Sequence, residues 1–485
     1  AGIVMQLNEK SVYINYAVTI LSLIAVLSII NNPKMNPGYK LMWAVCILAL
    51  PVTGICLYGI LGHSSVARKF RTHYDTVLLS QGGVLGEEEE TRKKLEEENI
   101  LAAGQSSYLT NYAHYPVYEN TETEYYPLGD VWFEHFIEEL KKAEHYIFME
   151  YFIISKGYMF DTISEIMMRK AKQGVDVRLI YDGIGTGMLN SKKIFDKLIE
   201  NGVQCREFNS FRPMMSSVQN NRDHRKIVVI DGNTAFNGGA NLADEYINHI
   251  QKHGRWKDAA VMLEGEAVRS LTAQFLQMWG ILKEPEYEQF LTRPIPVPEN
   301  AKGVAAPYGD CPLDGERVGE MVYIDLLNRA RDYIHIMTPY LILDGELETA
   351  LKFAAERGVD VHLILPGKPD KQFPYALAKS HYSALLDSGV KISEWSPGFV
   401  HAKVFVVDGR EAVVGTINLD YRSLYHHFED AVWMVDAPCI RDIEQDFQHT
   451  LEQCRTVENT SASIWQKHYL LRATGMLLKV IAPLL

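Results

Sequence analysis

Two long uncharged runs stand near the start of the chain. Residues 12–30 are 19 positions without a charge and residues 41–61 are another 21, each long enough to cross a hydrocarbon core of about 30 Å. The ten residues between them contain two prolines and one glycine, which break helices. The pattern predicts a transmembrane helical hairpin over residues 1–62. A buried hairpin of a soluble domain is the alternative.

Two further segments have distinctive charge patterns. Residues 86–98 (GEEEETRKKLEEE) read as a solvated charged helix within a linker over residues 63–125. At the other end, residues 464–485 mix leucine-rich turns with basic residues and are too interrupted to span a membrane. For residues 461–485 we predict a membrane-proximal or docking helix. A last helix packed on the preceding domain is the alternative.

Beyond residue 125 the pattern of hydrophobic and polar positions occurs twice. Residues 174–180 and 358–364 match at six of seven positions, and HRKIVVIDG at His224 is answered by HAKVFVVDG at His401. The offsets are 358 − 174 = 184 and 401 − 224 = 177, so two separate landmarks recur at nearly one spacing. The repeat is longer than the units of solenoid arrays, and it therefore indicates a duplicated domain.

Each copy predicts an amphipathic helix, an apolar strand, a second helix, another strand, and a further helix before the histidine strand. Strands that alternate with helices indicate an α/β class, in which helices cover the faces of mixed sheets. We expect the first domain over residues 126–300 and the second over residues 301–460. Two such domains facing each other would bring equivalent loops together across one cleft.

Composition narrows the class of partner. Hydrophobic residues make up 47% and charged residues 22%, so most of the chain should fold in water. The formal net charge of −13 repels polyanions, which disfavours nucleic acid as a partner. The six cysteines form no CxxC pair, so we expect buried thiols in a reducing compartment and neither a zinc knuckle nor a disulfide framework.

Both copies carry the same cluster of polar residues, which makes up the candidate active site. It consists of H-x-K-x-x-x-x-D followed by two small residues and an asparagine: His224, Lys226, Asp231, Gly238, Gly239 and Asn241 in the first copy, and His401, Lys403, Asp408, Gly415, Thr416 and Asn418 in the second. Residues i and i+2 of a strand project to one face, so each histidine should lie beside its lysine.

This convergence predicts a site for a tetrahedral oxyanion, and phosphate is the obvious candidate. Two lysines and two asparagines (Lys226, Lys403, Asn241 and Asn418) supply phosphate-binding groups. One imidazole can attack phosphorus while the other transfers protons. The arrangement requires no metal and no cofactor.

Carboxylates are also needed to orient the imidazoles, and Asp258 and Glu429 are the candidates, each following the histidine of its own copy. An alignment without gaps sets Asp258 opposite Asp430, which makes the two assignments inequivalent. Asp231 and Asp408 end their strands before a glycine, so support of a turn is the better interpretation for them than reaction. For Tyr151, Tyr340 and Arg212 we expect core or rim packing at the cleft.

The doubled motif resembles that of the phospholipase D superfamily. Further motifs are similar to those of its bacterial cardiolipin synthases: YYPLGD at Tyr125, MEYFI at Met149, YDGIGTG at Tyr181, FRP at Phe211, NNRDHRK at Asn220, PGFVHAK at Pro397 and NLDYRS at Asn418. Gly239 replaces the usual serine, and His427 stands where asparagine is commoner. The resemblance implies two duplicated domains with one shared, metal-free site.

The resemblance also implies an activity. Two phosphatidylglycerols would give cardiolipin and glycerol through a phosphatidyl-histidine intermediate, with His224 as nucleophile and His401 as acid and base. Rival functions are a hydrolytic phospholipase D, another phosphodiesterase such as a nuclease of the same fold, and a membrane scaffold with a decayed site.

Location follows from the predicted anchor and its flanking charges. Four basic residues (Lys10, Arg68, Lys69 and Arg71) against two in the loop (Lys34 and Lys40) place the catalytic domains on the cytoplasmic face. We expect a multi-pass protein of the bacterial inner membrane that acts on phospholipids. The sequence does not determine the acceptor or the oligomeric state.

Overall fold

The computed structural model describes residues 2–33, 35–61, 85, 89–186, 193–210, 220–282, 288–458, 474–475, 478–479 and 482–484. Arg212, the FRP motif, the basic residues 68–71 and most of the predicted C-terminal helix lie outside the described residues.

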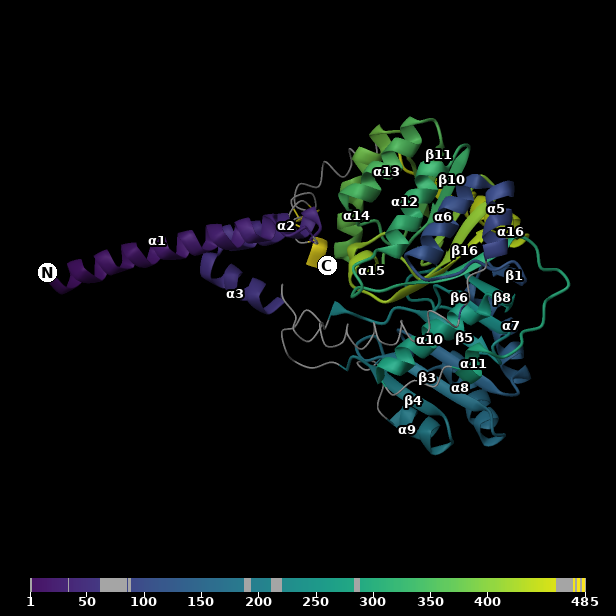
Figure 1. Ribbon diagram of the computed structural model, residues 1–485. Helices are drawn as coiled ribbons and strands as arrows, with labels where there is room; N and C mark the ends of the chain where they lie inside the picture. Colours follow the sequence, from purple (N-terminus) through teal and green to yellow (C-terminus); the bar gives the residue numbers. More distant parts are fainter. Residues whose placement is uncertain are drawn as a thin grey trace.

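Two halves, one from each copy of the repeat, form the body of the molecule (Figure 1). The first half contains β1 (Thr121–Tyr126), α7 (Gly129–Lys142), β2 (Tyr146–Tyr151), α8 (Tyr158–Lys172), β3 (Asp176–Asp182), α9 (Lys193–Glu200), β4 (Gln204–Phe208), β5 (Lys226–Ile230), β6 (Thr234–Gly238), β7 (Arg255–Lys257), β8 (Ala260–Gly265), α10 (Val268–Leu282) and α11 (Glu288–Leu291). The second contains β9 (Val304–Asp310), α12 (Val318–Arg329), β10 (Tyr333–Met337), α13 (Gly345–Glu356), β11 (Asp360–Pro366), α14 (Gln372–Asp387), β12 (Lys391–Trp395), β13 (Gly398–Val400), β14 (Val404–Val407), β15 (Glu411–Gly415), α15 (Tyr421–Tyr425), β16 (Glu429–Val435), α16 (Cys439–Leu451) and β17 (Cys454–Thr456).

The two halves share one topology. The first has a seven-stranded sheet of order β1-β8-β6-β5-β2-β3-β4, and the second an eight-stranded sheet of order β17-β12-β11-β10-β14-β15-β16-β9. Apart from the edge strand β17, every strand of one sheet has a counterpart at the same place in the other. In each sheet β2-β3-β4 or β10-β11-β12 run parallel and the remaining pairs antiparallel. The predicted α/β class, with two mixed sheets flanked by helices, is confirmed.

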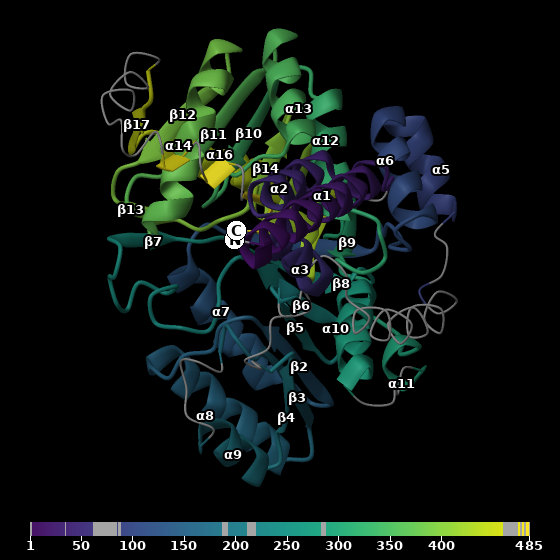
Figure 2. The same ribbon diagram turned by 90° about the vertical axis from the view of Figure 1, so that its left-hand side faces the viewer.

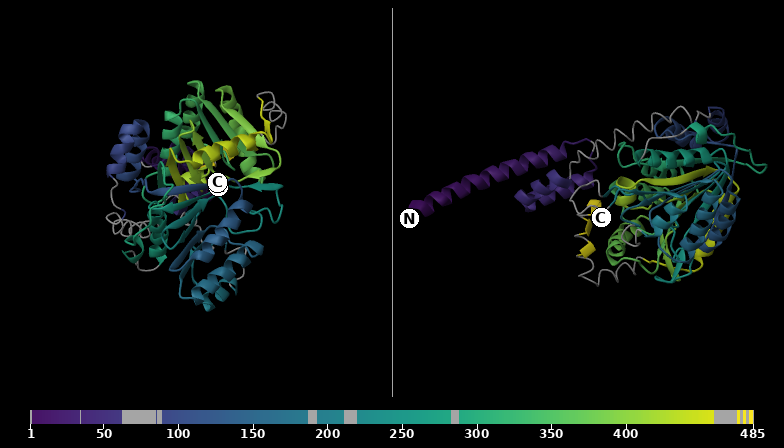
Figure 3. Two further views of the ribbon diagram at one scale, coloured as in Figure 1. Left: turned by 90° about the vertical axis from the view of Figure 1, so that its right-hand side faces the viewer. Right: turned by 90° about the horizontal axis from the view of Figure 1, so that it is seen from below.

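A hydrophobic core continues across the junction of the halves. It includes Phe148 and Phe275 of the first half, whose rings stack 4.6 Å apart, together with Val404 and Phe447 of the second. Helix α10 also contacts β9, and α16 contacts β1, so each helix reaches the outer strand of the other half. The yellow helix α16 is seen on the face turned away from the N-terminal helices (Figure 3, left). The halves therefore form a single body.

The N-terminal hydrophobic segment forms three helices where two were predicted. Helix α1 (Gly2–Ile30) projects from the body and contains Val12–Ile30, the one stretch of the described residues long and apolar enough to cross a membrane (Figure 1). The second expected span, residues 41–61, is divided between α2 (Pro37–Ala49) and α3 (Pro51–Leu61). Proline lacks an N–H and disfavours helical backbone in the residue before it, which explains why the helix ends there. Among the described residues there is no second continuous helix long enough to span.

The stretch expected to be a linker is partly packed. Helices α5 (Glu89–Glu98) and α6 (Ile100–Asn111) place Leu95, Ala102 and Leu109 in one hydrophobic cluster with Val322 and Leu326 of the second half. Strand β1 begins at Thr121, before the expected boundary at residue 126, because it pairs with β8 and completes the first sheet.

Candidate functional site

The two histidine motifs occupy equivalent places at the junction of the halves. Lys226 begins β5 and His224 stands two residues before it, and His401 and Lys403 stand just before β14. All four side chains are buried, and the strands that follow, KIVVI and VFVV, are buried throughout. Apolar strands therefore fix the polar motifs in the interior, where their charges are weakly screened.

Backbone hydrogen bonds cross between the halves beside both histidines. The N–H of His224 donates to the carbonyl of Phe428 at 2.9 Å, and the N–H of His401 donates to the carbonyl of Lys257 at 2.7 Å. Near His401 the crossing is a short parallel pair, β7 with β13. Each histidine thus lies next to the segment that carries the orienting carboxylate of the other half.

The carboxylates accordingly bond to the histidines of the opposite halves. Nδ1 of His224 lies 2.8 Å from Oε2 of Glu429, and Nδ1 of His401 lies 2.7 Å from Oδ2 of Asp258. Both carboxylates are fully buried. The sequence had placed each carboxylate with the histidine of its own copy, and the structure corrects this pairing.

Asp258 and Glu429 are structurally equivalent, contrary to the alignment of the sequence. Gly238 pairs with Ala260, and Gly415 pairs with Ala431. Each carboxylate stands two residues before the paired alanine. The alignment without gaps is therefore displaced by one residue here.

The small residues after β6 and β15 differ in what they offer the carboxylates. The Thr416 hydroxyl donates to Glu429 Oε2 at 2.5 Å. A Cβ on Gly239, the counterpart, would lie 2.1 Å from Asp258 Oδ1, which leaves no room for a side chain unless Asp258 moves. Gly239 in place of a serine is therefore matched to the position of Asp258.

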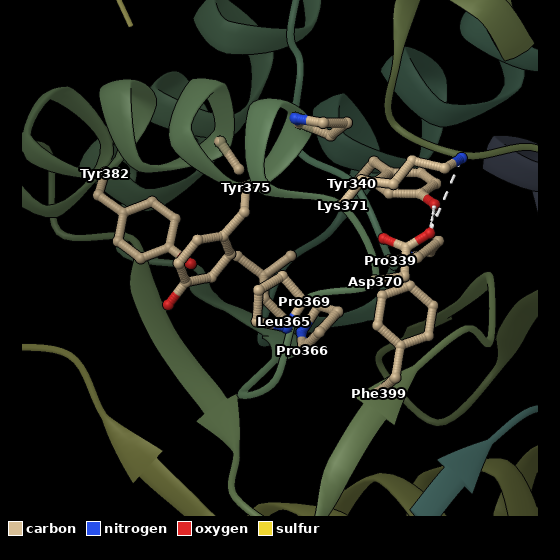
Figure 4. A pocket seen from close by; sticks show the side chains of 12 residues that line it. Pro339, Tyr340, Leu365, Pro366, Pro369, Asp370, Lys371, Tyr375, Tyr382 and Phe399 are labelled. Carbon is tan, nitrogen blue, oxygen red and sulfur yellow. Dashed lines mark hydrogen bonds and ion pairs between the residues drawn. The ribbon is translucent and has the colours of Figure 1, made fainter. Parts of the chain in front are cut away.

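Both histidines open onto one cavity of about 420 Å³. Asn241, Asn418 and His427 also line it. At one side Tyr340 donates to Asp370 at 2.7 Å, and Lys371 Nζ lies 3.8 Å from the same carboxylate (Figure 4). Tyr340 thus borders the cavity, whereas Tyr151 is buried in the core of the first half.

The lysines and asparagines hold the loops around the histidines. The ammonium group of Lys226 donates to the carbonyl of His224 at 2.6 Å, and that of Lys403 lies 3.0 Å from Nδ1 of His401. Among the described residues, neither lysine lines the cavity.

Each asparagine amide also has a partner within its own half. Nδ2 of Asn241 donates to the Tyr246 hydroxyl at 2.8 Å, and Nδ2 of Asn418 donates to the Ser423 hydroxyl at 3.0 Å. Each amide nitrogen keeps a second hydrogen that it can offer to a ligand.

Burial sets the protonation of the motif. It lowers the pKa of His224 well below the usual 6.5 and that of His401 to about 4, where Lys403 adds to the effect. Burial also lowers the pKa of Lys226 to about 8 and that of Lys403 to about 7. Near neutral pH the imidazoles are therefore neutral. Because the carboxylates can only accept, Nδ1 carries the proton and Nε2 keeps its lone pair.

Three further buried carboxylates lie near the charge of Arg225, beside the first motif. Burial raises the pKa of Glu150 well above its usual value, that of Asp223 to about 7 and that of Asp430 to about 6. Burial also acts to raise the pKa of Glu429, but the interaction with His224 outweighs it and lowers the net value. The charge of Glu429 is thus stabilised by its histidine, which fits a carboxylate that orients an imidazole.

Asp231 and Asp408, which the motif includes among the candidate catalytic residues, lie at the far end of their strands. Asp231 accepts backbone hydrogen bonds from Glu144, His145 and Tyr146 at 2.7–2.8 Å, and Asp408 accepts three equivalent bonds. Both have a left-handed backbone, with φ of 53° and 51°. Asp231 comes five positions after Lys226 along the strand, a distance of roughly 16 Å. We therefore assign both aspartates a supporting role.

Replacement of Asp408 by alanine should lower stability and spare the chemistry. The change removes three charge-assisted hydrogen bonds and leaves alanine at positive φ, which together should cost about 3 kcal/mol. Asp408→Asn, which keeps one acceptor oxygen, should lose less. Thermal unfolding and turnover per folded molecule would measure the two effects. A large fall in turnover with unchanged stability would contradict the assignment.

Three aromatic residues of the site were missed from the sequence. Phe152 packs on His224 with ring centroids 5.1 Å apart, and Tyr246 and Trp256 lie 5.4 and 5.3 Å from the ring of His401. Only the place of Trp256 two residues before Asp258 hinted at this role. These rings shield the imidazoles from water.

One donor set near the site has the composition of a metal site. His224, His427 and Glu429 present ligand atoms within 4.8 Å of one another. The first half offers Trp256 at the position equivalent to His427, so the set is not duplicated there. Glu429 is hydrogen-bonded to His224 and Thr416, and these bonds stabilise its buried carboxylate.

Comparisons with known proteins agree with this geometry. The family described as "Cardiolipin synthase, PLD-like domain" matches residues 136–279 and 323–451, and "Phospholipase D-nuclease N-terminal" matches residues 20–63. "Cardiolipin synthase 2" of Bacillus anthracis is 35% identical over 86% of this chain and 82% of its own length. "Cardiolipin synthase" of Geobacillus kaustophilus is 31% identical over 96% and 92%.

A solved structure shares the fold. The phosphatidylserine synthase of Haemophilus influenzae superimposes with a TM-score of 0.56 at 15% identity, over 75% of this chain and 95% of that one.

Proposed function

The chain belongs to the bacterial cardiolipin synthases of the phospholipase D superfamily, and on that premise we propose its substrate and the mechanism of its site. The proposed reaction joins two phosphatidylglycerols into cardiolipin and glycerol. The observation that carries the proposal is the pair of crossed histidine–carboxylate hydrogen bonds on one cavity. Two oriented imidazoles facing one phosphorus are what a two-step group transfer needs.

In the first step Nε2 of His224 attacks the phosphorus of one phosphatidylglycerol. The nitrogen lone pair forms the N–P bond, and the P–O bond to the headgroup glycerol breaks with its electron pair on that oxygen. His401 gives the leaving oxygen a proton. Asp258 and the bound phosphodiester anion both favour the imidazolium, so substrate binding raises the pKa of His401 and prepares it to donate.

In the second step a hydroxyl of another phosphatidylglycerol attacks the phosphatidyl-histidine. His401, now neutral, removes the hydroxyl proton, the new P–O bond forms, and the N–P bond returns its electrons to His224. The cycle restores both imidazoles. Water as the acceptor would instead give phosphatidic acid, the hydrolytic outcome.

Lys226 and Lys403 supply positive charge for the phosphate. Their ammonium groups now donate to histidine carbonyls, and these bonds can be exchanged for bonds to phosphate oxygens. The second amide hydrogens of Asn241 and Asn418 can also donate hydrogen bonds to phosphate oxygens. Phe373, at the start of α14, lines the cavity with its side chain 64% exposed and offers an apolar rim for acyl chains.

The decisive experiment is incubation of the full chain with pure phosphatidylglycerol, followed by mass analysis of the lipids. We expect cardiolipin and free glycerol in equal amounts. Phosphatidic acid as the main product would identify a hydrolase, and no lipid change together with cleavage of a nucleic acid would refute the proposal.

The rate should depend on pH in two limbs. At low pH kcat/KM falls as His224 becomes protonated and loses the lone pair that attacks phosphorus, at a pKa that burial holds well below 6.5. At high pH it falls as Lys403 and Lys226, with pKa values of about 7 and 8, lose their charge. Lys403→Arg keeps its charge, so in any residual activity the alkaline limb should move upward. An alkaline limb that stays in place in this variant would contradict the role of the lysine charge.

A further inference from the structure

The second hydrophobic segment folds back on itself at Leu50. That residue leaves the helical conformation, with φ −133° and ψ 75°, and Pro51 follows it. A Cβ on Gly54 would lie 2.6 Å from the carbonyl oxygen of Cys46, so the two helices pack backbone against backbone there. Glycine is the residue that permits this approach.

Contacts between α2 and α3 confirm the reversal. The rings of Trp43 and Tyr58 lie 5.2 Å apart, although 15 residues of continuous helix would separate them by roughly 22 Å. Met42 and Ile47 of α2 share a cluster with Ile55 of α3 and with residues of α1. Helices α2 and α3 are therefore a packed helical hairpin.

Neither arm of this hairpin is long enough to cross a bilayer. The 13 residues of α2 span roughly 20 Å and the 11 residues of α3 roughly 16 Å, against a hydrocarbon core of about 30 Å. Helix α1, with Val12–Ile30 apolar, is long enough. Figure 2 looks along α1 toward the body and shows the three helices in front of the junction of the halves.

The turn between α1 and α2 is bonded to the catalytic body. Nδ2 of Asn36 donates to the Tyr425 hydroxyl at 2.7 Å, and the Tyr39 hydroxyl is hydrogen-bonded to Nε2 of His426. The Tyr39 ring also packs on Tyr421, with centroids 6.1 Å apart. A turn that contacts α15 in this way must lie on the same side of the membrane as the catalytic halves.

We propose that the chain crosses the membrane once, through α1, and that α2–α3 is a re-entrant hairpin which enters and leaves the bilayer on the catalytic side. The charges then divide more unequally than for two crossings. With one crossing, the sequence positions of Lys34, Lys40 and the basic residues 68–71 count toward the catalytic side, and that of Lys10 counts toward the opposite side. Five against one favours a cytoplasmic catalytic face, where four against two favoured it weakly.

The re-entrant hairpin also places the cavity at the membrane surface. Tyr421 lines the cavity on one side and contacts Tyr39 on the other. Helix α15 lies between Asn418, which lines the cavity, and Glu429, which orients His224. The anchor is thus bonded to a helix flanked by residues of the site, and lipid can reach the cavity from the adjoining leaflet.

Cysteine accessibility tests the topology independently of activity. The full chain would carry alanine at Cys46, Cys56, Cys205 and Cys454, and retained activity would show that it folds. Single cysteines would then be placed at Asn31 in the turn, at the exposed Glu144 of the body and at Asn8 before the span. Intact and permeabilised cells would be treated with a membrane-impermeant maleimide.

We expect Asn31→Cys to be labelled under the same condition as Glu144→Cys, and Asn8→Cys under the opposite one. Opposite behaviour of Asn31→Cys and Glu144→Cys would establish two crossings and overturn it. Labelling of Asn8→Cys together with Glu144→Cys would show that α1 does not cross, which would also overturn it.

Cross-linking gives a second measurement. In the same background, Asn36→Cys with Tyr425→Cys should be joined by a short bismaleimide and change mobility on a denaturing gel. Asn36→Cys with Arg410→Cys is the control, because Arg410 is exposed and pairs instead with Asp436. A 36–425 pair that links no better than the control would contradict the docked turn.

Discussion

Replacement of His224 by alanine should abolish the conversion of phosphatidylglycerol to cardiolipin, a loss of roughly 10⁴-fold or more, because the N–P bond can no longer form. His401→Ala should be as inactive toward this substrate, since the glycerol oxygen then leaves without a proton. The fold should survive both changes, because the strands after the two motifs are held by apolar residues. Lipid mass analysis and thermal unfolding would measure these outcomes.

The two variants should differ in what they retain. With radiolabelled phosphatidylglycerol, His401→Ala should hold a trace of lipid covalently on His224, whereas His224→Ala should hold none. Lipid found on His401 in the His224→Ala protein would reverse the order of the two roles. His381→Asn is a matched control, since His381 is buried, lies 3.0 Å from Glu348 and is not among the residues lining the cavity. It should keep near-normal turnover.

The parts of the site that local sequence determines were predictable. In HRKIVVIDG and HAKVFVVDG, an unbroken run of four apolar residues follows the lysine, as in a buried strand, so the histidine and lysine could be placed together on one face of that strand. The duplication placed both motifs in one cleft. Asp231 and Asp408 could be set aside on local grounds as well, because aspartate before glycine at a strand end is typical of a turn.

What depends on contacts between the halves could not be predicted. The carboxylates cross because the segments around Phe428 and Lys257 bond to the opposite halves, and no local pattern records this. The alignment was displaced because the shared Asp-Ala pair in WKDA and FEDA favours a register that the strand pairing Gly415 to Ala431 excludes.

The hydropathy of the second hydrophobic segment also gave no sign of the helix break at Leu50 and Pro51. Residues 41–61 have no charge, and a scale that sums transfer free energy is insensitive to one proline. The break follows from the backbone, since Pro51 disfavours helix at Leu50 and Gly54 lets α3 pack on α2. The sequence thus showed that the apolar segment is long enough to cross a membrane, but it did not show that the chain reverses direction within that segment.

The crossed pairing can be tested through the leaving group. When the substrate is a phosphatidyl ester of p-nitrophenol, the leaving group departs as a stable phenolate and needs no proton. The first step should therefore be largely rescued in His401→Ala and should stay blocked in His224→Ala. Glu429→Gln and Asp258→Asn should each lower kcat/KM for phosphatidylglycerol by about 10²- to 10⁴-fold, because an uncharged amide orients and polarises the imidazole poorly.

With the p-nitrophenyl ester these two variants should separate. Asp258→Asn should release p-nitrophenolate in a burst, as His401→Ala does, because Asp258 bonds to His401 at 2.7 Å. Glu429→Gln should show no burst, as His224→Ala does, because Glu429 bonds to His224 at 2.8 Å. If each carboxylate served the histidine of its own half, Asp258→Asn would instead behave like His224→Ala, and Glu429→Gln like His401→Ala. Each carboxylate variant must resemble the variant of the histidine that it orients, so the comparison reports the pairing whichever histidine is the nucleophile.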